Sequence, residues 1–200
     1  MTKKEFVLSE RQFLIKLLKQ LSPKQWHYKT LCEGWSIDDL AAHIVARESS
    51  TISNIGIVVP KFHSLHDKRI AKIKAKGHDY IISKLEQYPW WMPAVANTAE
   101  FYIHNEDILR SQLKIHRPEP SKEAGEILWQ SLKGLTTIRK DLVSDLGSVQ
   151  LENIQTGAVL TLENKRKRKD TVVSGLPGEL LLFVYGRRSA AKVKITTAKI

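Results

Sequence analysis

Apolar residues recur at helical spacing through most of residues 1–145. The first such run carries Phe13, Leu14, Leu17, Leu18 and Leu21. Residues three or four apart lie on one face of an α-helix, so this run predicts an amphipathic helix. Ser9 with Gln12 three residues later is a capping-box pattern, and we expect the helix to begin there.

Further helices follow along the same part of the chain. Ser36 precedes the run IDDLAAHIVARE with Asp39 at the third helical position, which predicts a second helix with a capped start. Residues 50–63 show no sustained period and are expected to form a loop. A charged helix is predicted over 66–87, weakened at Gly77.

Two more helices complete the predicted bundle. Residues 96–113 form the next helix, with Thr98 as its expected cap, and the following RPEP ends it. The last helix fills roughly 121–145.

The pattern changes after Gly147. Short alternating runs predict strands, and an apolar run that begins near a proline predicts one helix. The strands are expected at 149–154, 158–163, 171–175 and 192–196, and the helix at 175–190. The chain is therefore predicted to be mainly α, with a helical bundle over residues 1–146 and a small α/β domain over 147–200.

The composition suits a folded protein of the reducing cytoplasm. Apolar residues make up 42% of the 200 residues, and no uninterrupted apolar run is long enough to cross a bilayer. The start of the chain lacks the apolar middle of a secretory signal. A single cysteine excludes an internal disulfide framework, so we expect a cytoplasmic protein with no membrane partner.

The net charge of +11 raises nucleic acid as a partner. Much of the excess is local, because residues 165–169 read KRKRK between two predicted strands. That block most simply forms the tip of a β-hairpin, where its side chains stay hydrated. We therefore rank nucleic-acid binding below the alternatives that follow.

Two acid–histidine pairs carry the candidate chemistry. Glu100 precedes His104 by four residues, and Asp39 precedes His43 by the same spacing, so each pair shares a helix face. Two helices that turn such pairs inward can hold one divalent ion. The alternative is a pair of solvated or salt-bridged contacts, although the apolar neighbours of Glu100 and His104 favour burial.

Three segments resemble one known family. They are LCEGWSIDDLAAHIVARE, NTAEFYIHNEDILR and GLPGELLLFVYGRRSAAKVKI. Their order and spacing are similar to the metal-binding family related to mycothiol-dependent maleylpyruvate isomerase, within the DinB-like four-helix superfamily. The resemblance implies a DinB-like four-helix bundle followed by a small C-terminal α/β domain.

The resemblance also implies a ligand set. The family's triad is one histidine from the second helix and a Glu-x-x-x-His pair from a later helix, which correspond to His43, Glu100 and His104. Asp39 is not a family ligand and keeps only a capping or supporting role. Relatives often carry a second histidine directly after the third ligand, where this chain has Asn105.

The implied function is thiol chemistry at a metal. The implied cofactors are a divalent ion, zinc by preference, and mycothiol or a similar low-molecular-weight thiol. Arg110 and Arg187 would bind the thiol or an anionic substrate, whereas Arg188 is expected in an ordinary ion pair. We favour an S-transferase or isomerase acting on an electrophilic substrate, and a homodimer is compatible with this reading. The alternatives are a non-catalytic or regulatory metal-binding protein and a basic nucleic-acid-binding module.

Several other residues lie near these motifs. Trp35, Trp90 and Trp91 are candidates for core positions first and for a pocket wall second. Cys32 is expected to be a buried, inert thiol. The histidines of the charged middle segment, His63, His66 and His78, are expected to be exposed and unrelated to the metal.

Overall fold

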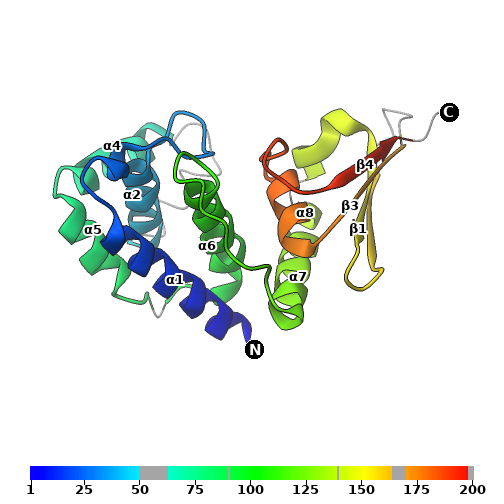
Figure 1. Ribbon diagram of the computed structural model, residues 1–200, viewed down its shortest axis with the longest axis horizontal. Coiled ribbons are helices and arrows are strands. Elements are labelled where there is room, and N and C mark those ends of the chain that lie inside the picture. Colours follow the sequence, from blue (N-terminus) through cyan, green and yellow to red (C-terminus); the bar gives the residue numbers. More distant parts are fainter. Residues whose placement is uncertain (50–62, 90, 139, 164–169, 198–200) are drawn as a thin grey trace. The chain divides into compact units, whose positions relative to one another are not determined.

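The computed structural model describes residues 1–49, 63–89, 91–138, 140–163 and 170–197 (Figure 1). Most of the expected loop at 50–63, Trp90 and the KRKRK block lie outside the described residues.

Contacts divide the chain into two compact units. The first, which we call the helical unit, comprises Val7–Asn97 and His104–His116. The second, the sheet unit, comprises Met1–Phe6, Thr98–Ile103 and Arg117–Ile200. Two helices therefore contribute residues to both units.

The helical unit is built on five α-helices in the described part of the chain. They are α1 (Lys3–Gln20), α2 (Ile37–Glu48), α4 (His63–Lys74), α5 (His78–Leu85) and α6 (Ala94–Leu109). Helix α2 packs against both α4 and α5, as Figure 1 shows. Eleven of the twelve residues of α2 are buried, so this helix forms the centre of the unit.

Helix α1 begins earlier than the sequence predicted. The backbone N–H of Thr2 donates to Glu5 Oε2 at 2.8 Å, and the N–H of Glu5 donates to Thr2 Oγ1 at 3.2 Å. This reciprocal pair is a capping box. Ser9 lies inside the helix, so the predicted start at Ser9 is wrong.

The charged helix predicted over 66–87 is two helices. Helix α4 ends at Lys74, and α5 begins at His78 after Gly77, whose φ is +86°. Residues that carry a side chain rarely adopt a positive φ of this size, whereas glycine adopts it at no steric cost. Gly77 therefore breaks the helix rather than weakening it.

Helix α6 also begins before its predicted cap. Pro93 occupies the N-cap position, and Thr98 is a buried residue inside the helix, so the prediction of Thr98 as the cap is wrong. Later in the helix, Asn105 is fully buried and its amide donates to the backbone oxygen and the carboxylate of Glu10 at 3.0 and 2.8 Å. Asn105 therefore ties α6 to α1.

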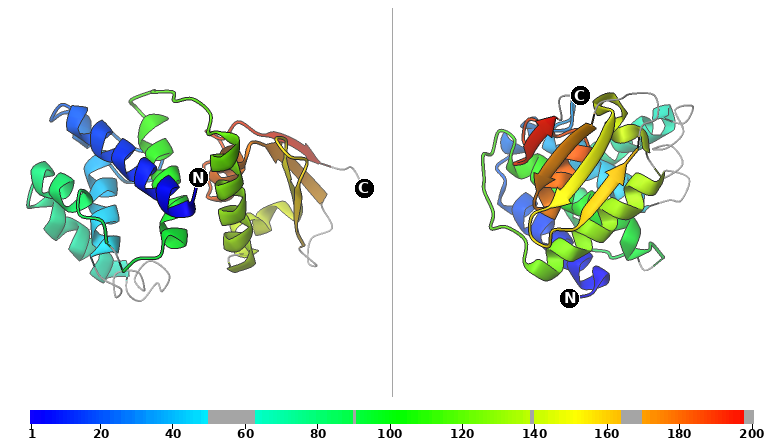
Figure 2. Two further views of the ribbon diagram at one scale, coloured as in Figure 1. Left: turned by 90° about the horizontal axis from the view of Figure 1, so that it is seen from below. Right: turned by 90° about the vertical axis from the view of Figure 1, so that its right-hand side faces the viewer.

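The sheet unit contains four described strands and two α-helices. The strands are β1 (Ser148–Asn153), β2 (Val159–Leu162), β3 (Asp170–Gly175) and β4 (Lys194–Thr197), and the helices are α7 (Lys122–Ile138) and α8 (Pro177–Val184). The sheet has the order β2-β1-β3-β4, with β1 parallel to β3 and the other pairs antiparallel. Helices α7 and α8 cover the same face of this sheet (Figure 2). Short 3-10 turns over Lys140–Leu146 lead from α7 into β1.

The strands that flank KRKRK do not form a hairpin. Strand β1 lies between β2 and β3, so these two strands are not neighbours and the hairpin prediction is wrong. The pairing has a physical reason. The central strands β1 and β3 carry buried side chains such as Val149, Leu151 and Val173, whereas no residue of β2 or β4 is buried, so β2 and β4 lie at the edges of the sheet.

The core of the sheet unit joins the sheet, α7, α8 and residues of α6. Tyr102 of α6 belongs to this apolar cluster. Its ring lies so close to Gly178 of α8 that a Cβ added at Gly178 would lie 2.1 Å from the Tyr102 hydroxyl oxygen. Glycine at this position is therefore required for the close approach of α8 to Tyr102.

The architecture agrees with the predicted fold class, which is mainly α with a small C-terminal α/β part. The contacts group α7 with the sheet, whereas the sequence analysis placed it with the bundle. The domain boundary between residues 146 and 147 stays a prediction, because a grouping by contacts does not test which segments fold independently. Among the described helices, none combines the length and apolar character needed to span a membrane.

Candidate metal centre

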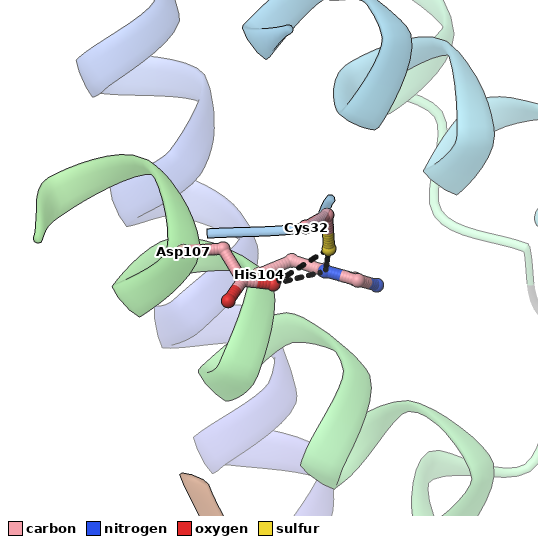
Figure 3. A group of neighbouring side chains, drawn as sticks. All are labelled: Cys32, His104 and Asp107. Atoms are coloured by element: carbon pink, nitrogen blue, oxygen red, sulfur yellow. Dashed lines mark hydrogen bonds and ion pairs between the residues drawn. The ribbon is translucent and has the colours of Figure 1, made fainter. Parts of the chain in front are cut away.

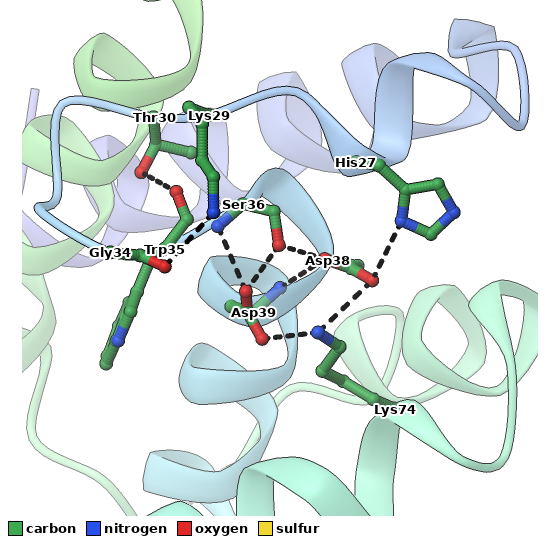
Figure 4. Close-up of polar contacts among 9 residues, drawn as sticks. All are labelled: His27, Lys29, Thr30, Gly34, Trp35, Ser36, Asp38, Asp39 and Lys74. Carbon is green, nitrogen blue, oxygen red and sulfur yellow. Dashed lines mark hydrogen bonds and ion pairs between the residues drawn. The ribbon is translucent and has the colours of Figure 1, made fainter.

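A polar network fixes the start of helix α2 (Figure 4). The backbone N–H of Ser36 donates to Asp39 Oδ2 at 3.0 Å, and the Ser36 hydroxyl donates to the same carboxylate. The first of these contacts, together with the approach of the Asp39 backbone N–H to the Ser36 side chain, forms the capping box that the sequence predicted. Asp39 is thereby engaged at the helix end, in agreement with the capping role assigned to it.

Lys74 of α4 reinforces this network. Its ammonium group forms a salt bridge with Asp39 and lies 3.3 Å from Asp38 Oδ2. Partial burial alone would raise the pKa of Asp39, but hydrogen bonds from Lys74 and Ser36 outweigh that effect and hold the pKa below its usual value. The network therefore joins α4 to the first turn of α2.

His43 lies in the middle of α2, and three aromatic rings surround it. Its ring centroid is 4.8 Å from that of Trp35, 4.9 Å from that of His66 and 5.3 Å from that of His104. The ring is buried, so it is held by packing as well as by polar contacts.

His66 corrects a prediction. It was expected to be exposed and unrelated to the site, but it is buried, and its Nε2 lies 2.7 Å from Nδ1 of His43. A signal in the sequence could have found it, because His66, Ile70 and Ile73 share one face of α4 and all three are buried. His78 is also partly buried, with its ring stacked 4.0 Å from that of Trp26.

His104 has a carboxylate partner on its own helix (Figure 3). Its Nδ1 lies 3.0 Å from Oδ2 of Asp107, which is fully buried. The thiol of Cys32 donates to the same oxygen at 3.1 Å. Cys32 therefore contacts the site through Asp107, and sequence reasoning missed this carboxylate.

The three residues of the implied triad lie together. His43, Glu100 and His104 each offer one ligand atom, and these atoms lie within 4.8 Å of one another. Ligands about 2.0–2.2 Å from one ion and arranged tetrahedrally lie about 3.3–3.6 Å apart, so atoms within 4.8 Å of one another reach that geometry by a modest shift of the side chains. Two imidazoles and one carboxylate are ordinary ligands for a divalent transition metal, and the donor set fits such an ion.

A second group shares one of these residues. Cys32, His104 and Asp107 also offer three atoms within 4.8 Å of one another. In this group the carboxylate already accepts from the thiol and contacts the imidazole nitrogen Nδ1. A carboxylate that holds the outer nitrogen of a ligating histidine is the common supporting arrangement at metal sites. The second group is thus suited to orient His104, which leaves its Nε2 for the first group.

The predicted arginines are engaged with neighbours. Arg110 Nε donates to Glu106 one turn earlier in α6. Arg187 donates to the backbone oxygen of Tyr185 at 2.6 Å. Arg188 forms a two-pronged ion pair with Asp145 at 2.6 and 2.8 Å, as expected for an ordinary ion pair. A role of Arg110 and Arg187 in binding a thiol or substrate stays a prediction.

Comparisons with known proteins agree with the resemblance seen in the sequence. Residues 7–61 match the family model described as the mycothiol maleylpyruvate isomerase N-terminal domain. Two solved structures are similar: a mutant of the mycothiol-dependent maleylpyruvate isomerase with a TM-score of 0.65, and the same isomerase with a TM-score of 0.61. Each is 15% identical and covers 99% of this chain and 93% of its own. At this identity the likeness establishes a shared fold. No curated protein matches the chain.

The cap of α2 yields a stability prediction. Asp39→Ala removes the capping hydrogen bonds and the Lys74 ion pair, so we expect a loss of about 1 kcal/mol in the free energy of unfolding at neutral pH. Folding lowers the pKa of Asp39. Its contribution to the free energy of unfolding is therefore present at pH values above the ordinary pKa of 3.8, and it is lost as the pH falls through the lowered pKa. Urea unfolding of both proteins from pH 7 down to pH 3 measures the difference.

Glu33→Ala is the matched control, because Glu33 is an exposed acid in the loop before α2. We expect this variant to unfold like the parent. An equal loss of stability in the two variants would mean that net charge, rather than the cap, is responsible.

Proposed function

We propose that this protein is a thiol-dependent isomerase or S-transferase whose divalent metal is held by His43, Glu100 and His104. The observation that carries the proposal is the approach of these three ligand atoms to within 4.8 Å. The match of residues 7–61 to a domain named for a mycothiol-linked isomerase supports the thiol as the second cofactor.

The supporting contacts suit this arrangement. If Nδ1 of His43 donates to Nε2 of His66, then Nε2 of His43 carries the free lone pair that a ligand needs. Asp107 holds the proton of His104 on Nδ1 in the same way and leaves Nε2 as the ligand atom. His66 and Asp107 are therefore positioning residues for the two ligating imidazoles.

The chemistry follows from the state of the thiol. A free thiol is mostly protonated at neutral pH, and a bound divalent cation supplies the positive charge that makes a coordinated thiol lose its proton. The indole of Trp35 packs beside His43 and limits the access of water to that side of the imidazole. A nucleophilic thiol kept in a partly dry site would add to an electrophilic carbon of an alkene. If the sulfur stays on that carbon the result is S-transfer, and if the former double bond rotates and the thiol is then eliminated the result is the isomerised alkene.

The metal ligands are tested by zinc binding. We expect the parent protein to bind about one zinc ion per chain and His43→Ala to bind more than about a hundredfold more weakly, because a ligand is lost. Isothermal titration calorimetry on dialysed protein measures both affinities.

His116→Ala is the control for that experiment, because His116 is exposed and lies outside both ligand groups. This variant should bind zinc like the parent. Equal binding by the parent and His43→Ala would show that the ions are adventitious, and the proposal would be wrong.

The role of His66 is tested separately. His66→Ala should weaken zinc binding about tenfold by freeing the ring of His43, and His66→Gln, whose amide oxygen can accept from Nδ1, should restore part of the loss. Competition with a chromophoric chelator measures zinc affinity in the absence of substrate. Unchanged affinity in His66→Ala would remove His66 from the site, and a loss of thermal stability without a loss of affinity would make it a packing residue only.

The thiol reaction is the third test. With a small thiol such as mycothiol and an electrophilic cis alkene, the zinc-loaded parent should either consume the thiol or convert the alkene to its trans isomer with the thiol recovered, and His43→Ala should fall to the background rate. Titration of the remaining thiol and the ultraviolet absorbance of the alkene follow the two outcomes. Stoichiometric zinc binding with neither thiol consumption nor isomerisation would instead identify a metal-binding protein with no catalytic task.

A further inference from the structure

A large cavity lies in the helical unit, on the side of α4 and α5. Its volume is about 790 Å³, and its wall includes the end of α2, both charged helices and residues of the segment 87–91. Ligand-binding pockets in proteins commonly measure about 300–1,000 Å³, so the cavity has room for a small organic molecule.

Five cations line this cavity. They are Lys68, Arg69, Lys72, Lys76 and Lys84. Three come from α4 and one from α5, so the helix break at Gly77 turns two charged helices around one hollow. No carboxylate in the described part of the chain forms an ion pair with any of the five.

Among the described lining residues, the one carboxylate does not neutralise the five cations. Glu48 is buried and already forms a salt bridge with Arg11, and it accepts a hydrogen bond from Asn97 at 2.8 Å. Burial raises the pKa of Glu48 in spite of the arginine beside it. The electrostatic character of the cavity is therefore set by its cations.

Aromatic and aliphatic side chains supply the rest of the wall. Tyr80, Tyr88 and Trp91 contribute rings, and Leu65 adds an exposed aliphatic group. The ammonium group of Lys76 lies 4.5 Å from the centre of the Tyr80 ring, a cation–π distance that holds it at the cavity. An aromatic surface and fixed positive charge meet in one hollow.

Lysine on a helix surface is most often simply hydrated. Here the cations instead surround a concave, partly apolar space, which is the combination that binds a molecule with an apolar body and an anionic group. We propose that this cavity is a binding site for a small organic anion of that kind, with a carboxylate, sulfonate or phosphate held by the lysines and Arg69.

The cavity has a defined relation to the candidate metal centre. His66 lines the cavity, and its Nε2 lies 2.7 Å from Nδ1 of His43. A molecule that contacts His66 in the cavity is thus separated from His43, a proposed metal ligand, by the imidazole ring of His66. The anion site nevertheless depends on its own cations and not on the metal.

The experiment uses naphthoate as the anion and naphthamide, its uncharged amide, as the matched ligand. Isothermal titration calorimetry is run on the full chain at low salt with EDTA, so that no metal takes part. Lys72→Glu reverses one charge of the cavity, and Lys133→Glu makes the same change at an exposed position of α7 outside the lining residues.

We expect saturable binding of one naphthoate per chain and much weaker binding of naphthamide. Lys72→Glu should weaken naphthoate binding roughly threefold to tenfold, and Lys133→Glu should leave it unchanged. Equal weakening in the two variants would mean attraction by net charge alone, and absence of saturation would mean no site. Each of these results overturns the proposal.

Two further measurements separate this proposal from others. Naphthoate binding that persists in His43→Ala supports the anion site whether or not the protein binds zinc, so the two proposals fail independently. If a DNA duplex displaced naphthoate and bound more tightly through Lys72, the surface would be a nucleic-acid site and the small-anion proposal would be wrong.

Discussion

The contact between two buried imidazoles organises the helical unit. His43 of α2 and His66 of α4 approach to 2.7 Å through ring nitrogens, and such a contact is favourable only if one ring donates and the other accepts. The pairing fixes the tautomers of both rings together. It also fixes how α4 lies along α2, and Lys74 of α4 holds the other end of the same helix pair through Asp39.

The two proposed imidazole ligands are supported in different ways. His43 is held from another helix, by His66 and by the indole of Trp35, whereas His104 is held within α6 by Asp107. The first arrangement depends on how two helices pack, and the second depends only on helical spacing. Burial around both rings makes each contact harder to replace with water.

Local features could be predicted from sequence more reliably than distant ones. The cap at Ser36 and Asp39 follows from four residues of sequence, and the structure has it as expected. The start of α1 was misplaced because Ser9 fits the same pattern, while the true pair, Thr2 and Glu5, lies before the first apolar position. A capping pattern alone does not say which of two candidates the helix uses.

Distant relations were harder to predict. Strands β2 and β3 were placed correctly by their alternation, but an alternating pattern does not identify the partner strand, and β1 lies between them. The burial of His66 was not predicted, because α4 is highly charged and only a few of its positions, such as His66, Ile70 and Ile73, form a buried face. The candidate triad came from the resemblance, since spacing within one helix pairs Glu100 with His104 but cannot bring His43 to them.

The close approach of Tyr102 and Gly178 has a consequence for the variation of this chain. Tyr102 lies on the same helix as Glu100 and His104, and the space for its ring exists only because residue 178 has no side chain. A related sequence with a residue larger than glycine at position 178 must carry a residue smaller than tyrosine at position 102. The packing therefore couples the residue types that positions 102 and 178 can hold at the same time.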